Sequence, residues 1–71
     1  MIYKKKDSIT YDVKAKVISG KYIFISDMIS DYNEAIKLAE DTFKKNKEEV
    51  GSIEIWETKN KLTTNFKLRI P

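Results

Sequence analysis

Alternation of apolar and polar residues predicts two strands near the start of the chain. Between positions 9 and 17 every second residue is apolar, which is typical of a strand with one buried face. Ser19 and Gly20 follow as a turn, because glycine adopts a positive φ without a side-chain clash. Residues 21–26 then read Lys-Tyr-Ile-Phe-Ile-Ser, a run of strong β-formers. We therefore expect the first two strands to form a β-hairpin.

A helix is expected from about Tyr32 to Lys47. Asp31 and Glu34 have the spacing of a capping box, in which the aspartate accepts a hydrogen bond from an early backbone N–H. Gly51 ends the helical stretch. Apolar residues at spacings of three and four form one stripe along the helix: Tyr32, Ala35, Ile36, Ala39 and Phe43.

Two further strands are expected after the helix. Residues 52–58 form the third strand, and a polar turn leads into the fourth, residues 62–70. In the fourth strand the even-numbered residues, which are apolar except for Thr64, face one way, and the polar residues between them face the other. Two hairpins around one helix predict an α+β fold of ββαββ order, with one four-stranded sheet, mainly of antiparallel hairpins, and a single helix packed on one face. This single domain covers residues 9–71, and residues 1–8 are expected to be a flexible N-terminal segment. The strand order stays open.

Composition limits the chemistry that the protein can perform. The chain has 71 residues and contains neither cysteine nor histidine, which excludes disulfides, thiolate nucleophiles and imidazole or thiolate metal sites. A domain this small has little room for a deep, dry cavity. Glu54 and Glu57, the best-placed carboxylates, are three apart on a strand and so point to opposite faces. We expect no catalytic residue, cofactor or metal, and therefore no enzyme.

Charge and the chain ends point to a cytoplasmic protein with no membrane segment. The net charge of +3 is a mild excess. The basic start, residues 4–6, is followed by polar residues where a signal peptide would have an apolar run. The lysines at 44–47 are interpreted as a solvated helix end in preference to a phosphate site.

If the helix covers one sheet face, the strand residues divide into two sets. The core set is Val13, Ala15, Val17, Ile23, Ile25, Ile53, Ile55, Phe66 and Leu68. The other face, which we call the open face, carries aromatic residues among cations and is the candidate binding surface, made of Trp56, Tyr22, Phe24, Lys14, Lys16, Lys67 and Arg69. A strict two-residue turn at Ser19-Gly20 would exchange the faces of Tyr22 and Phe24 with those of Ile23 and Ile25, whereas a longer turn keeps this assignment.

Three interpretations of the open face remain. In the first, the face contacts another protein or a second copy of this chain, since interface centres favour Trp, Tyr and Phe with a charged rim. Alternatively, single-stranded nucleic acid stacks on the aromatic residues while lysines and Arg69 hold phosphates. In the third interpretation the aromatics only brace their cross-strand neighbours, and the domain has no specific site. A single arginine and eleven acidic residues count against nucleic acid, so we favour protein contact.

The stretch from Lys21 to Ala39, in which a hairpin strand leads into a capped helix, resembles segments of many small bacterial and phage domains. No motif in it identifies a single family. The resemblance implies a class of compact, cysteine-free, lysine-rich proteins of phages or mobile elements, some of which modulate or inhibit a host protein. It assigns no role to any residue.

Overall fold

The computed structural model describes residues 8–60 and 62–71, and it has the predicted ββαββ order. The elements are β1 (Ile9–Val17), β2 (Tyr22–Ile29), α1 (Tyr32–Lys45), β3 (Val50–Lys59) and β4 (Thr63–Ile70). The expected flexible segment, residues 1–8, lies outside the described residues except for Ser8. In the described part of the chain, no helix is long and apolar enough to cross a membrane.

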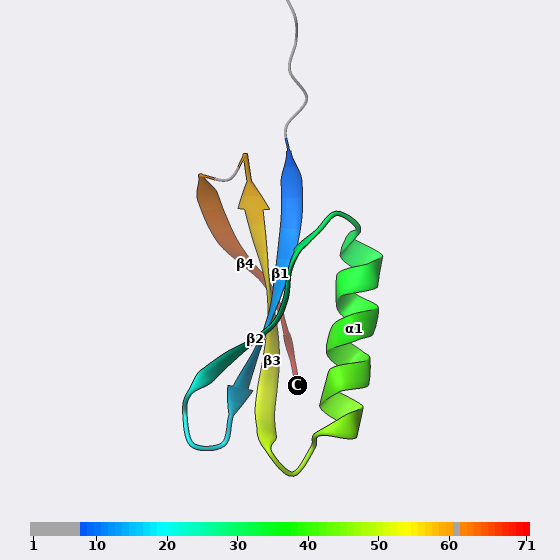
Figure 1. Ribbon diagram of the computed structural model, residues 1–71, viewed down its shortest axis with the longest axis vertical. Helices are drawn as coiled ribbons and strands as arrows, with labels where there is room; N and C mark the ends of the chain where they lie inside the picture. Colours follow the sequence, from blue (N-terminus) through cyan, green and yellow to red (C-terminus); the bar gives the residue numbers. More distant parts are fainter. Residues whose placement is uncertain (1–7, 61) are drawn as a thin grey trace, which may run out of the picture.

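All four strands form one antiparallel sheet in the order β2-β1-β3-β4, which the sequence had left open. Because β2 and β3 both run antiparallel to β1, they run parallel to each other with β1 between them. α1 carries the chain from β2, past β1, to β3, and it lies along one side of the twisted sheet (Figure 1). The opposite side of the sheet has no second layer among the described residues, so it is the open face.

The helix begins where its cap was predicted and ends two residues early. The Asp31 carboxylate accepts a hydrogen bond of 2.9 Å from the backbone N–H of Asn33, which confirms the cap. The helix was expected to reach Lys47 but ends at Lys45. Asn46 is the C-cap, with a non-helical φ of −129°; its backbone N–H donates to the carbonyls of Thr42 and Phe43, and its side-chain amide donates to the Thr42 carbonyl at 2.9 Å.

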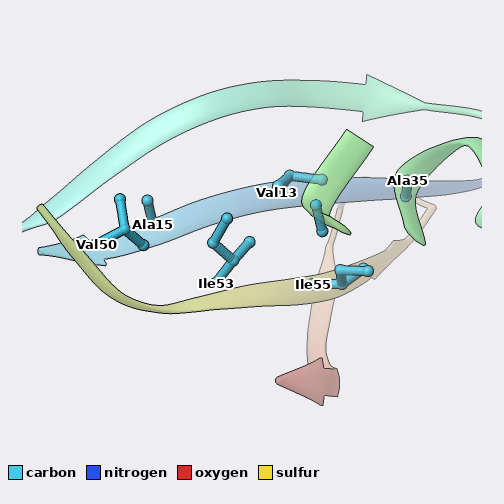
Figure 2. Close-up of a cluster of buried hydrophobic side chains, with 7 residues drawn as sticks. Val13, Ala15, Ala35, Val50, Ile53 and Ile55 are labelled. Atoms are coloured by element: carbon cyan, nitrogen blue, oxygen red, sulfur yellow. The ribbon is translucent and has the colours of Figure 1, made fainter. Parts of the chain in front are cut away.

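The core lies between α1 and the two central strands. Its fully or nearly fully buried residues come from β1, α1 and β3 (Figure 2): Val13, Ala15, Ala35, Ala39, Val50, Ile53 and Ile55. The two alanines on the helix face let its backbone approach the sheet closely. Ile25 and Leu68 pack against this core while partly buried, so the core prediction is confirmed for these two residues and for Val13, Ala15, Ile53 and Ile55.

Two predicted core residues of the first hairpin lie at its margin instead. Ile23 points to the helix side opposite Ala15 but is 50% exposed, and Val17 is only half-buried. β2 is an edge strand, and α1 packs mainly over β1 and β3, so the helix does not reach far enough to cover Ile23. The prediction assigned the face correctly and overestimated the burial.

The first hairpin has the longer turn. The backbone N–H of Val17 donates to the carbonyl of Lys21 at 2.9 Å, and Gly20 has a φ of +99°. Lys16 therefore faces Tyr22, and Lys14 faces Phe24 across the strand pair. This register puts both aromatic residues on the open face, as the longer-turn alternative predicted.

β2 departs twice from a regular ladder. Ile25 is an extra residue between the pairs Lys14 with Phe24 and Val13 with Ser26, which makes a β-bulge. A second irregularity follows before Ile29, where Met28 has a φ of +54° and its backbone N–H donates to Asp12 Oδ1 at 3.2 Å. The outer strand is therefore bent at two points.

A bulge in β4 overturns the face assignment of Phe66 and Lys67. Leu68 faces Ile55, but Phe66 faces the next residue, Trp56, so Lys67 is an extra residue. Leu68 keeps its core position, whereas Phe66 lies on the open face and is 50% exposed. Phe66 was predicted in the core and Lys67 on the open face, and both predictions are wrong because strict alternation does not hold across a bulge.

Lys67 lies instead on the helix side, among polar groups. Its Nζ is 3.7 Å from the Glu57 carboxylate and 6.0 Å from the centre of the Tyr32 ring. Tyr32 also contacts Tyr11, with ring centroids 5.0 Å apart. Burial, followed by the charge of Glu57 and a hydrogen bond to it, raises the pKa of Tyr11, while Lys67 opposes this shift. This group joins β1, β3 and β4 to the start of α1.

Candidate functional site: an aromatic and cationic patch on the open face

Every strand contributes two side chains to one patch on the open face. We call it the open-face patch, and it consists of Lys14 and Lys16 from β1, Tyr22 and Phe24 from β2, Glu54 and Trp56 from β3, and Phe66 and Arg69 from β4. Between β1 and β2, Lys14 pairs with Phe24 and Lys16 with Tyr22. Lys14 also pairs with Glu54 on β3. Between β3 and β4, Glu54 pairs with Arg69 and Trp56 with Phe66, so all eight side chains lie on one face. The patch therefore crosses the whole width of the sheet.

A buried carboxylate organises the centre of the patch. Glu54 is only 5% exposed although no helix covers it. Its Oε2 accepts a hydrogen bond from the Tyr22 hydroxyl at 3.1 Å, and its Oε1 accepts one from Trp56 Nε1 at 2.9 Å. Burial of a carboxylate is costly unless such donors satisfy it, and charge-assisted hydrogen bonds are stronger than neutral ones. Glu54 thus holds two aromatic rings from strands on either side of β1.

The same contact changes the titration of the tyrosine. The hydrogen bond to Glu54, followed by burial and by the carboxylate charge, raises the pKa of Tyr22, and Arg69 acts in the opposite direction. Tyr22 therefore stays a neutral hydrogen-bond donor over the ordinary pH range. The opposing effect of Arg69 also shows that its guanidinium lies near enough to act on the patch.

The lysines lie over aromatic rings. Lys14 Nζ is 5.1 Å from the centre of the Phe24 ring and 5.3 Å from that of Trp56. Lys16 Nζ is 5.8 Å from the centre of the Tyr22 ring. Each distance is within the range of a cation–π interaction. Lys14 and Lys16 are therefore in direct contact with the three aromatic residues that the sequence placed on the same face.

Phe24, Tyr22 and Phe66 remain half exposed or more despite these contacts, whereas Trp56 is partly buried. Phe24 is 64% exposed and Tyr22 is 53% exposed. Trp56 packs edge-on against Phe66, with ring centroids 5.5 Å apart and an angle of 77° between the planes. The face thus offers a broad apolar surface with the orientation of each ring fixed by a neighbour.

Part of this surface is hollowed. An open hollow of about 400 Å³ is lined by Lys14, Tyr22, Phe24, Glu54 and Trp56. The aromatic rings supply its apolar walls, and the internally bonded Glu54 lies in its lining. Its volume lies within the range of small-ligand pockets in proteins.

The patch contains six of the seven residues predicted for the binding surface: Lys14, Lys16, Tyr22, Phe24, Trp56 and Arg69. Lys67 is excluded by the bulge, and Phe66 takes part instead. Glu54 was considered in the sequence as a catalytic candidate, and its organising role was missed. The available signal was its position two residues before the tryptophan, on the same face of one strand.

The described residues contain no cluster of acidic side chains that could hold a metal ion. Glu54 and Glu57 point to opposite faces, as predicted, since Glu54 pairs with Lys14 and Glu57 with Tyr11. A second hollow, of about 290 Å³, lies at the end of α1 and is lined by Lys44, Lys45, Asn46, Lys47, Glu48 and Glu49. Lysines are favoured there by the negative end of the helix dipole, and two glutamates offset their charge.

Comparisons of the chain with protein-family models, with curated proteins and with solved structures found no significant match. The contacts within the open-face patch are therefore the basis for a functional proposal.

Proposed function

We propose that this protein is a non-enzymatic binding module that contacts another protein through the open-face patch. The observation that supports this most is the set of exposed aromatic rings held in fixed orientations around an open hollow. Interface centres are rich in Trp, Tyr and Phe, and rings that are already ordered lose little entropy on binding. An origin in a phage or mobile element, with a host protein as the partner, stays a prediction from the resemblance alone.

The open-face patch differs from the predicted binding surface at two residues, and both differences favour a protein partner over nucleic acid. The β4 bulge adds the apolar ring of Phe66 to the patch and removes the cation of Lys67. Phosphate binding depends on the number of cations available, whereas protein contact gains from apolar surface. The exchange therefore weakens the electrostatic basis for nucleic-acid binding.

The internal contacts of the patch point the same way. The Tyr22 hydroxyl and Trp56 Nε1 already donate to Glu54, and a base would have to compete with that carboxylate for them. Lysine ammonium groups already lie over one face of the Phe24, Trp56 and Tyr22 rings, where a stacked base would otherwise fit.

Selection of a displayed library of random peptides against the purified protein tests this proposal. We expect enriched sequences whose binding is lost in Phe24→Ala, because that ring is 64% exposed and its removal spares the fold. Ile18→Ala is the matched control, since Ile18 is 70% exposed in the β1–β2 turn, outside the patch.

Binding to a single-stranded oligonucleotide is measured in parallel at low and moderate salt. The nucleic-acid alternative predicts affinity that falls steeply with salt. Peptide binding that is equal in wild type and Phe24→Ala, or oligonucleotide binding that depends on Phe24, would overturn the proposal.

A further inference from the structure

We infer that the partner segment is an acidic peptide in which one large apolar side chain, flanked by carboxylates, enters the hollow of the open-face patch. The inference rests on the proposed function and adds the chemistry of the partner. It follows from the charges that the patch leaves available and from the walls of the hollow.

The available charge around the hollow is positive. Three cations, Lys14, Lys16 and Arg69, belong to the patch, against one carboxylate. That carboxylate, Glu54, is 5% exposed and has a hydrogen bond on each oxygen, so it has little capacity to accept a cation from a partner. Asp12, next along β1 on the same face, uses Oδ1 to accept from the backbone N–H of Met28. A partner therefore meets a net positive charge, in which Lys16 and Arg69 are exposed, Lys14 is partly buried over two rings, and each carboxylate already accepts at least one hydrogen bond.

The wall of the hollow selects an apolar side chain. Phe24 and Trp56 line it, and Lys14 spans the space between their rings with its aliphatic stem and ammonium group. A leucine or phenylalanine side chain would remove apolar ring surface from water, at about 25 cal/mol per Å² buried. Carboxylates on either side would then reach Lys16 and Arg69, which belong to strands on opposite sides of β3.

The same charges disfavour a second copy of the chain as the occupant. Two open faces packed against each other would bring Lys14, Lys16 and Arg69 close to their own copies. Like charges opposed across an interface reduce its stability, and the two carboxylates that the strand pairing places on this face, Glu54 and Asp12, are buried or partly buried and already accept hydrogen bonds. An acidic partner has the complementary charge.

The test uses the peptides enriched in the library selection and three synthetic peptides of equal length. The first has a leucine flanked by aspartates, the second has the same leucine flanked by lysines, and the third has serine in place of leucine between aspartates. Trp56 is the only tryptophan in the chain, so its fluorescence reports directly on occupation of the hollow. We expect the first peptide to bind at least about tenfold more tightly than either of the others.

Charge reversal gives the matched variants. Lys16→Glu with Arg69→Glu should weaken binding of the aspartate-flanked leucine peptide at least about tenfold. Lys44→Glu with Lys45→Glu makes the same change in net charge at the far end of α1 and should leave that binding unchanged, which separates contact at the patch from the overall charge of the protein.

Three outcomes would overturn the inference, and they differ in what they mean for the proposed function. Enrichment of neutral or basic peptides that still require Phe24 would reject an acidic partner while supporting protein binding. Equal loss of binding in both charge-reversal pairs would also reject contact at the patch cations. Enrichment that does not depend on Phe24 would reject both the inference and the proposed function.

Discussion

Replacement of Phe66 by alanine tests the β4 bulge, because the two possible faces for this ring predict different losses of stability. The ring is 50% exposed and contacts Trp56 edge-on. Full burial of a phenylalanine is worth about 1.5–3 kcal/mol, so half burial contributes about 1 kcal/mol. An edge-to-face pair adds about 0.5–1.5 kcal/mol. We expect Phe66→Ala to lower the free energy of unfolding by about 1.5–2.5 kcal/mol.

Ile53→Ala is the matched core variant. Ile53 is fully buried between β3 and α1, and its truncation should cost about 2–5 kcal/mol. Urea unfolding followed by far-ultraviolet circular dichroism measures both losses without depending on Trp56 fluorescence, which Phe66→Ala would change. If Phe66→Ala costs as much as Ile53→Ala or leaves the chain unfolded, the ring lies in the core and the bulge at Lys67 is wrong.

Three further perturbations have defined outcomes. Asp31→Ala should cost about 1 kcal/mol by leaving an early helix N–H without its acceptor, and an unchanged urea midpoint would contradict the cap. Gly20→Ala should cost about 1–2 kcal/mol, because Gly20 has a φ of +99°. Gly51→Ala is the control and should not destabilise the protein, since the added Cβ would make only an ordinary contact of 3.5 Å with a backbone carbonyl. Equal urea midpoints for the two variants would refute the turn geometry. Tyr22 and Tyr11 both have pKa values raised above 10.0, so their contribution to stability is complete below about pH 10 and is lost as the pH rises through the raised values. Urea midpoints at about pH 9 and about pH 11 measure this loss of stability, which should be smaller in Tyr22→Phe. An equal loss of stability in that variant would show that Tyr22 does not contribute to it.

The sequence predicts most of this fold because local signals and burial agree along most of the chain. The alternation of β1, the cap at Asp31 and the glycine at position 20 each require one local conformation, and the structure has all three. Strand order is not written in any local pattern. It depends on which strands the apolar face of α1 packs against, and these are mainly β1 and β3.

The candidate site was predictable except where the ladder is irregular. Alternation placed Tyr22, Phe24 and Trp56 on one face, and only the turn length was undecided. In β4, however, Phe66 and Leu68 look equivalent in sequence, and strict alternation puts both in the core. A single extra residue, Lys67, lies between them and puts their side chains on opposite faces of the sheet. The Lys67 ammonium group contacts the Glu57 carboxylate and lies over the Tyr32 ring on the helix side. These contacts are made with two other elements, β3 and α1, and they leave no pattern in the sequence of β4 itself.

The bulges in β2 and β4 lie on the two strands where a further chain could add to the sheet. These are the two outer strands of the sheet, and each has an irregular ladder, at Ile25 and before Ile29 in β2 and at Lys67 in β4. A long, flat, apolar edge strand is a template on which further chains add strand by strand, and β2 exposes Phe24 and Ile23 along such an edge. Bends at both edges interrupt that template. The chain thus keeps a broad aromatic face accessible in water while its backbone resists growth into an extended intermolecular sheet.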